Sequence, residues 1–225
     1  MIIACLCAAA ECQQADDAAI IRGVDAAVKA RLDGIAGYTV TEHYAVYRGG
    51  DEAHPAAEMT VKTTYERETG KSYAILSKSG SAVLQKFVLD SILENEKRIN
   101  EPGVREGSWL TSANYEMKLK PGGPERVNGR DCFVLSINPR QKAPNLIVGT
   151  LWVDTRDESI VQIKGTASKS VSAFTGPTEL MRQYTMVDGF AEATHARAVS
   201  SSFLFGQTVV TIDYVGYEIA NRATQ

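Results

Sequence analysis

The side chains best suited to acid–base or metal chemistry are few and lie far apart in the sequence. Its three histidines are His43, His54 and His195. None belongs to an HExxH or HxH pattern, which would place two imidazoles on one face of a helix or strand. We therefore predict no metal site, and we interpret each histidine as a polar surface residue.

The sequence also lacks the usual motif of a serine hydrolase. It contains no GxSxG turn, the structure that exposes the nucleophile in many of these enzymes. The segments Lys78–Gly80 and Ser112–Asn114 are similar to two boxes of penicillin-recognising serine enzymes. The SxxK box that would supply the nucleophile is absent, however, and the order of the boxes is reversed. We predict no catalytic residue and no enzyme activity, and a hydrolase is the least favoured alternative.

Glycine pairs and overall charge argue against nucleotide and nucleic-acid ligands. Gly49-Gly50 and Gly122-Gly123 separate expected strands, whereas a phosphate-binding loop opens a helix. The formal net charge of −3 gives no basic surface of the kind that binds nucleic acid. We therefore expect no cofactor and no nucleic-acid partner.

The cysteines do not form the pattern of a disulfide framework. Cys5, Cys7 and Cys12 lie near the N-terminus, and Cys132 lies within a strand pattern. A chain of 225 residues can bury a stable core without disulfide bonds. We expect no structural disulfide and interpret Cys132 as a small core residue.

The N-terminal residues resemble a targeting segment. They are apolar and small, and Ala8 and Ala10 fit the small-residue pattern of a signal-peptidase site. We expect residues 1–14 to be a signal-peptide-like leader or a disordered terminus, followed by a single domain over 15–220 and a tail over 221–225. A leader of this kind indicates an exported protein of the periplasm or cell envelope.

Hydrophobic spacing predicts two helices and about ten strands. The first helix begins near Asp16, and its apolar residues recur at helical spacing: Ile20, Val24, Val28, Leu32 and Ile35. The second begins after Gly80 and carries the stripe Leu84, Phe87, Val88, Ser91, Ile92 and Asn95. Alternation and turn signals place strands over residues 38–48, 57–66, 71–79, 114–119, 130–138, 146–154, 159–168, 178–187, 191–205 and 208–219.

These elements predict a mainly β, α+β fold with one curved antiparallel sheet. Short turns such as Asn128-Gly129 indicate that neighbouring strands pair as a meander. Two helices about 10 Å wide cannot cover roughly ten strands spaced about 4.8 Å apart. We therefore expect the sheet to curl into an unclosed β-barrel, or half-barrel, with the two helices as a lid over an apolar cavity. The alternative is a core that side chains fill completely.

Alternation along the strands identifies the side chains that could line such a cavity. The candidates are Met59, Val61, Tyr65, Tyr115, Met117, Leu119, Phe133, Leu135, Ile137, Leu151 and Val153. The lid candidates are Leu84, Phe87, Val88 and Ile92. For each of these residues, ordinary core packing is the alternative role.

Three segments of the C-terminal half resemble a known family. Val127–Leu135 leads to a tryptophan hairpin at Gly149–Asp154, and Tyr184–Phe190 contains a Tyr-x-x-apolar-Asp-Gly turn. Together they resemble the LolA/LolB-like superfamily of outer-membrane lipoprotein-sorting proteins. The resemblance implies an unclosed β-barrel with a helical lid. It also implies a lid arginine, for which Arg31 and Arg48 are the candidates.

The resemblance suggests a function in transport. Such a protein would shield acyl chains during lipoprotein sorting, in the manner of a chaperone, and would work as a monomer. Its partners would be a lipid or a lipidated protein, and a transport component of the inner or outer membrane. The alternative from the same fold is an envelope sensor or regulatory domain that acts by binding another protein.

Overall fold

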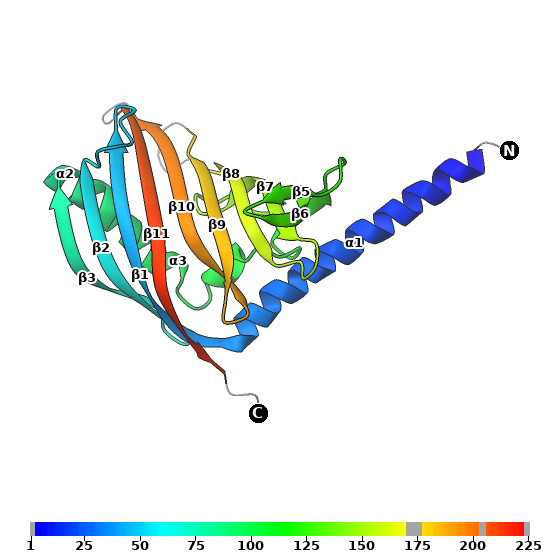
Figure 1. Ribbon diagram of the computed structural model, residues 1–225, viewed down its shortest axis with the longest axis horizontal. Coiled ribbons are helices and arrows are strands. Elements are labelled where there is room, and N and C mark those ends of the chain that lie inside the picture. The colour runs from blue at the N-terminus through cyan, green and yellow to red at the C-terminus, as the bar shows by residue number, and fades with distance from the viewer. Residues whose placement is uncertain (1–2, 170–176, 203–205, 223–225) are drawn as a thin grey trace.

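A single curved antiparallel sheet dominates the computed structural model, which describes residues 3–169, 177–202 and 206–222 (Figure 1). The fold is mainly β and the sheet does not close on itself, as the sequence predicted. The sheet has eleven strands: β1 Ile35–Arg48, β2 Ala57–Glu66, β3 Gly70–Gly80, β4 Tyr115–Leu119, β5 Glu125–Val127, β6 Arg130–Pro139, β7 Ile147–Asp154, β8 Ile160–Ala167, β9 Glu179–Val187, β10 Phe190–Ser202 and β11 Gly206–Asn221.

The strand order differs from the simple meander that short turns predicted. It runs β3-β2-β1-β11-β10-β9-β8-β7-β6-β4, with β5 paired to β6. Two meanders are therefore joined where β1 pairs with β11, which lies at the other end of the sequence. This pairing was missed because hairpin signals report only on strands that are adjacent in the chain. The edges of the sheet are β3 and β4, which follow each other along the chain after β1 and β2.

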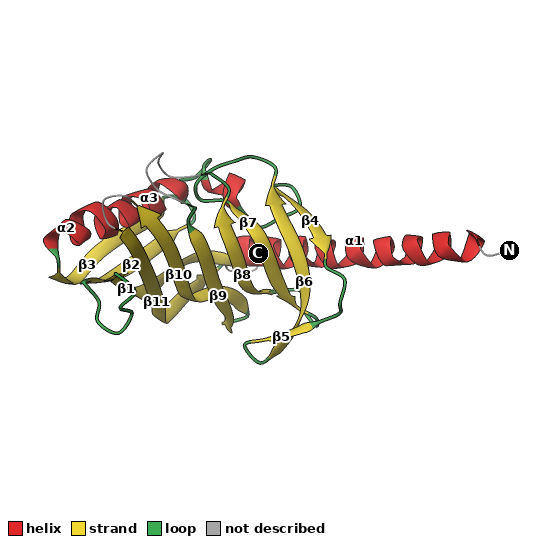
Figure 2. Ribbon diagram, turned by 90° about the horizontal axis from the view of Figure 1, so that it is seen from above, coloured by secondary structure: helices red, strands yellow, loops and turns green. Residues whose placement is uncertain are grey.

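The connection between these two edges forms one part of the lid. It leaves the sheet at β3, crosses the open side and returns at β4, so it must span the mouth of the half-barrel (Figure 2). It contains α2 Ala82–Leu84, the π-helix η1 Gln85–Asp90, α3 Ser91–Ile99 and the 3₁₀ helix η2 Arg105–Ser108. Ser81 caps the start by accepting a hydrogen bond from the backbone N–H of Leu84 at 3.5 Å.

The π-helical turn changes which residues face the sheet. Leu84, Leu89 and Leu93 are buried at 1%, 0% and 8% exposure. Phe87, expected on the buried stripe, is 61% exposed. A π-helix holds one more residue in its turn than an α-helix does, so the stripe moves by one position after Leu84. Regular spacing cannot anticipate such a shift.

The other part of the lid is the C-terminal portion of α1 Ile3–Gly34. The N-terminal portion of this helix extends away from the sheet (Figures 1 and 2). Two glycines let the C-terminal portion of α1 lie close to the rest of the protein. A Cβ on Gly23 would lie 2.6 Å from Glu158 Cγ, and one on Gly34 would lie 2.5 Å from Phe190 Cζ. Ile35, expected on the helix, instead begins β1. Within the described residues, no helix is long and apolar enough to span a membrane.

The inner face of the sheet packs into two separate apolar clusters. The first lies under η1 and α3 and consists of Tyr44, Val46, Ala57, Met59, Val61, Leu84, Leu89, Leu93, Ala196, Val210 and Ile212. The second lies beside α1 and consists of Val24, Tyr115, Met117, Leu135, Ile137, Leu146, Leu151, Val153, Ile160 and Ile163. Each helical element of the lid thus covers one end of the curved face.

Replacing Leu89 tests the shifted stripe. We expect Leu89→Ala to lower the free energy of unfolding by about 2–5 kcal/mol, because it leaves a cavity in the first cluster. Phe87→Ala, two residues away on the exposed side, should change it by no more than about 0.5 kcal/mol. Urea denaturation of both variants measures the difference. A larger loss for Phe87→Ala than for Leu89→Ala would contradict the assignment.

Candidate functional site

A cavity of about 650 Å³ lies between the two apolar clusters. Its walls come from the C-terminal part of α1, from α3, from the segment 108–110 and from the inner faces of β8 to β11. The volume falls within the range of small-molecule sites in proteins, about 300–1,000 Å³. The interior is therefore not filled completely by side chains.

Much of the wall is apolar, and small residues on β10 make room for it. Ala191, Ala193, Ala196 and Ala198 all line the cavity from this strand. The larger apolar side chains around them include Val28, Ile92, Leu110, Ile147, Ile160, Ile163, Leu180 and Ile212. An apolar chain placed there would contact hydrocarbon side chains on several sides.

An ion pair attaches α1 to the cavity wall. Arg31 donates two hydrogen bonds to Glu192 on β10, from Nε to Oε1 and from Nη2 to Oε2, both at 2.8 Å. Burial alone would lower the pKa of Arg31, but the charge and hydrogen bonds of Glu192 outweigh it and raise that pKa. The pair is bidentate; Glu192 is buried at 2% exposure, whereas the Arg31 side chain is 32% exposed. Arg31 is one of the two expected lid arginines. The other, Arg48, lies at the end of β1.

A second ion pair attaches α3 to the edge strand β3. Lys71 Nζ donates to Glu96 Oε2 at 3.0 Å, and the two side chains are 12% and 18% exposed. Burial opposes the charged form of both groups, yet their mutual attraction raises the pKa of Lys71 and lowers that of Glu96. Both residues line the cavity. Each helical part of the lid is thus held to the sheet by a partly buried ion pair.

Aromatic rings surround these ion pairs. Tyr38 and Tyr217 line the cavity, with ring centroids 5.6 Å apart in an edge-to-face arrangement. On its other side Tyr38 stacks on Tyr65, with centroids 5.0 Å apart. Arg105 lies over the Tyr65 ring at 5.7 Å and donates a hydrogen bond to its hydroxyl at 3.1 Å. This part of the wall is preorganised and amphipathic.

Most residues predicted to line the cavity pack in the clusters on either side of it. Of the eleven, Tyr115 reaches the cavity wall. Met59 and Val61 belong to the first cluster; Met117, Leu135, Ile137, Leu151 and Val153 belong to the second; Leu119 and Phe133 pack against the second; and Tyr65 stacks on Tyr38. Of the lid candidates, Ile92 lines the cavity, Leu84 and Val88 contribute to the first cluster, and Phe87 faces solvent.

The wall residues from β8 to β11 were missed at the sequence level. Alternation assigns residues to the inner face but does not reveal which of them a helix covers. The four alanines of β10 were a usable signal, because small inward side chains leave space where larger ones would fill it.

The histidines occupy positions that suit polar surface roles. His43 Nδ1 is 3.1 Å from Thr60 Oγ1, His54 Nδ1 is 3.1 Å from Asp51 Oδ2, and His195 Nδ1 is 2.7 Å from Asp213 Oδ1. In the part of the chain that the structure describes, no three His, Cys, Asp or Glu side chains gather as metal ligands. Cys132 is buried and unpaired with another cysteine.

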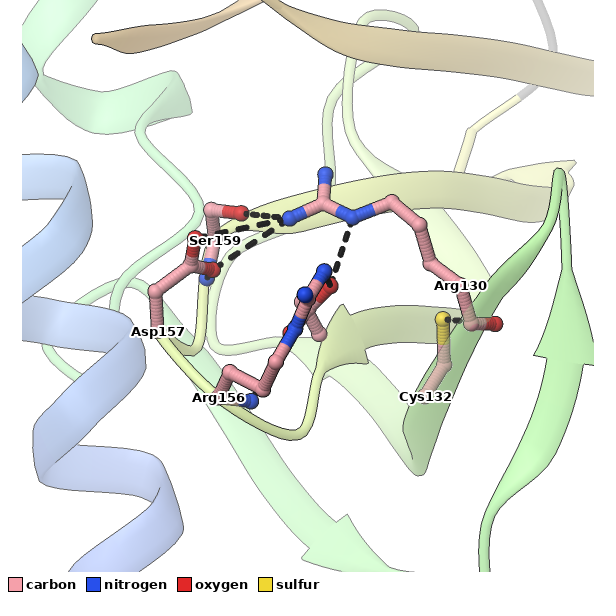
Figure 3. A network of polar contacts seen from close by, with 6 residues as sticks. Arg130, Cys132, Arg156, Asp157 and Ser159 are labelled. Atoms are coloured by element: carbon pink, nitrogen blue, oxygen red, sulfur yellow. Dashed lines mark hydrogen bonds and ion pairs between the residues drawn. The ribbon is translucent and has the colours of Figure 1, made fainter.

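A charged network fixes the β7–β8 turn at the rim of the cavity (Figure 3). Arg130 on β6 donates to Asp154 Oδ2 at 2.6 Å and to Ser159 Oγ at 2.9 Å. It also contacts Asp157 at 3.4 Å. Because Asp157 and Ser159 form part of the cavity wall, this network holds the wall in place.

Three solved structures align with most of the chain. They are a DUF1329 family protein from Desulfovibrio piger (15% identity, 88% of this chain and 92% of that one, TM-score 0.45), a domain from Vibrio parahaemolyticus named for outer membrane lipoprotein sorting (13%, 87% and 90%, 0.48) and a LolA superfamily protein from Nitrosomonas europaea (12%, 92% and 94%, 0.45). The third of these structures is described as a member of the superfamily that the sequence motifs resemble. No protein-family model and no curated protein sequence matches the chain.

The rim network makes stability depend on pH through Asp154. Hydrogen bonds from Arg156 and Arg130 lower the pKa of this buried carboxyl, although burial opposes them. The stability that ionised Asp154 contributes is therefore complete above the unfolded-state pKa of this carboxyl, near 4. It is lost as the pH falls through the lower folded-state pKa.

We expect Asp154→Asn to lower the free energy of unfolding by about 3 kcal/mol at pH 7, since Arg130 and Arg156 lose the buried carboxylate that both contact. The difference in the free energy of unfolding between this variant and the unmodified protein should shrink as the pH falls below about 4. Chemical denaturation across pH measures it, with Asp131→Asn, an exposed residue of β6, as control. A gap that stays constant down to pH 2 would contradict this role.

Proposed function

We propose that the protein binds an apolar chain, such as the acyl chain of a lipid or of a lipidated protein, in the cavity between its two core clusters. The observation that carries this proposal is a cavity of about 650 Å³ that remains open between well-packed regions. Native interiors are normally packed to a density that leaves few spaces larger than a water molecule. A space of this size is thus suited to a guest molecule.

The hydrophobic effect would supply the binding free energy. Each methylene transferred from water to the apolar wall contributes about 0.8 kcal/mol. Ten such groups would contribute roughly 8 kcal/mol, before the costs of association are subtracted. The ion pairs of Arg31 and Lys71 add little to that sum because they are already satisfied within the protein. Their role in binding is to hold the lid helices in position.

The expected setting follows from the family resemblance of the sequence. In the cell envelope, such a site would keep an acyl chain out of water while it moves between membranes. A transport component of one of these membranes would then deliver or receive the ligand. We propose carriage of a ligand, and not a chemical reaction, as the function.

Filling the cavity tests this proposal. We expect Ala198→Trp to abolish binding of a fluorescent fatty acid, because the indole would occupy the space in front of β10. The matched control is Val215→Trp on β11, where a side chain that is 48% exposed lies outside the cavity. Fluorescence titration measures binding, and thermal unfolding verifies that both variants are folded.

Two results would contradict the proposal. One is a failure of the unmodified protein to bind the fluorescent fatty acid or to retain any lipid in native mass spectrometry. The other is equal binding by a folded Ala198→Trp variant. Retention of lipid by the unmodified protein and its loss in the variant would support it.

The second candidate function is regulation through binding another protein, and the edge strand β3 favours it. Ile75 and Leu76 on this strand are 51% and 59% exposed. Its outer edge pairs with no described strand, so an extended peptide could add to the sheet there by backbone hydrogen bonds. A peptide-binding protein of this kind would lose its partner when Ile75 is replaced by Lys, whereas acyl-chain binding would be unchanged.

A further inference from the structure

We infer that Arg182 binds the anionic end of the ligand, so that the ligand is an amphiphile whose acyl chain ends in an oxyanion such as a carboxylate or phosphate. This inference rests on the proposed function and makes it more specific. It predicts a preference among ligands that an apolar cavity alone would not show.

Arg182 lies near the middle of the sheet, on a strand between the two apolar clusters. In the cross-strand register it is opposite Ala196 on β10 and Ile163 on β8. Both neighbours are buried apolar residues, and all three line the cavity. The guanidinium of Arg182 therefore lies between two apolar residues on the neighbouring strands, at the cavity wall.

The other charged side chains on the cavity wall have ionic partners. Arg31 pairs with Glu192, Lys71 with Glu96, Arg197 with Glu52, and Asp157 with Arg130. Arg182 differs: among the described residues, no carboxylate oxygen lies within 4.0 Å of its guanidinium. It is the positive charge in the wall that a ligand could neutralise.

The groups beside Arg182 leave that charge available. The phenols of Tyr184 and Tyr214 line the same cavity and lie near enough to interact electrostatically with Arg182. Glu96 is near enough to interact electrostatically, but this carboxylate accepts hydrogen bonds from Lys71 at 3.0 Å and from Asn100 Nδ2 at 3.4 Å. A neutral phenol does not neutralise the charge, and a guanidinium has five N–H donors.

The chemistry of these groups matches an oxyanion. A guanidinium presents two parallel N–H groups to a carboxylate or phosphate, and such charge-assisted hydrogen bonds are stronger than neutral ones. The hydroxyls of Tyr184 and Tyr214 could donate further hydrogen bonds. From this point the acyl chain would extend along Ile163 and Ile160 toward Leu110.

Ligands that differ only at the polar end test the inference. Palmitate, methyl palmitate and palmitoyl lysophosphatidate would each compete with a neutral fluorescent dye, N-phenyl-1-naphthylamine, for the full-length protein at pH 7.5. We expect at least one of the two anions to bind about tenfold or more tightly than the ester. Which of the two binds better identifies the oxyanion as a carboxylate or a phosphate.

Substitution of the arginine should remove that preference. In Arg182→Met, affinity for the preferred anion should fall about tenfold or more, and affinity for methyl palmitate should be unchanged. Arg126→Met, an exposed residue on β5 outside the cavity, serves as the control and should keep the preference. Thermal unfolding verifies the fold of each variant.

The possible failures are distinguishable. If the unmodified protein binds neither the dye nor any of the three ligands, the proposed function is wrong. If it binds all three ligands equally, or if a folded Arg182→Met variant keeps the preference for the anion, the inference about Arg182 is wrong while the proposed function stands. The comparison of anion with ester in the unmodified protein tests the inference without any substitution.

Discussion

The width of the inner sheet face, compared with the helices available to cover it, determines the rest of this structure. Ten strands lie side by side from β3 to β4, which at about 4.8 Å between neighbours gives a face roughly 43 Å across. A helix with its side chains is about 10–12 Å wide. The two parts of the lid can each cover one end of such a face, but together they cannot cover its centre. A cavity between two packed clusters is the consequence.

The same constraint explains why charged side chains occur in the interior. Where the lid helices border the cavity, the open space separates them from the apolar side chains of the sheet. Ion pairs connect the lid to the sheet there: Arg31 joins α1 to β10, and Lys71 on β3 joins α3 to the sheet. Burying a charge is costly unless a partner and hydrogen bonds compensate for it, and both pairs meet this condition. The lid is therefore held in place by polar contacts at the positions where hydrophobic packing is weakest.

The sequence predicted the individual elements better than the way they come together. Turn residues explain this success: Asn128 and Asp188 adopt positive φ values of 50° before Gly129 and Gly189, which is the local conformation of a tight hairpin. The pairing of β1 with β11 is different in kind, because no local pattern encodes a contact between residues so far apart in the chain. The π-helical turn at Gln85–Asp90 is likewise invisible to a regular helical spacing.

The cavity wall was the least predictable feature, for a physical reason. Met59 and Leu135 point to the same side of the sheet as Ala196, yet the first two are buried in the clusters while Ala196 also faces the cavity. Side-chain alternation distinguishes the two faces of a sheet, but the path of the lid decides which inward residues remain uncovered.

The clearest trace of the site in the sequence is a break in that alternation. Along β9 the inward positions are Leu180, Arg182, Tyr184 and Met186, so a guanidinium occupies a place where the pattern calls for an apolar side chain. A sequence selected for stability alone would place an apolar residue there, since even partial burial of a charge without an ionic partner is unfavourable. Local exceptions of this kind are expected at functional positions, where the constraint comes from a ligand and not from the fold. On the proposed function, a bound anion explains the position of Arg182 better than the packing of the empty protein does.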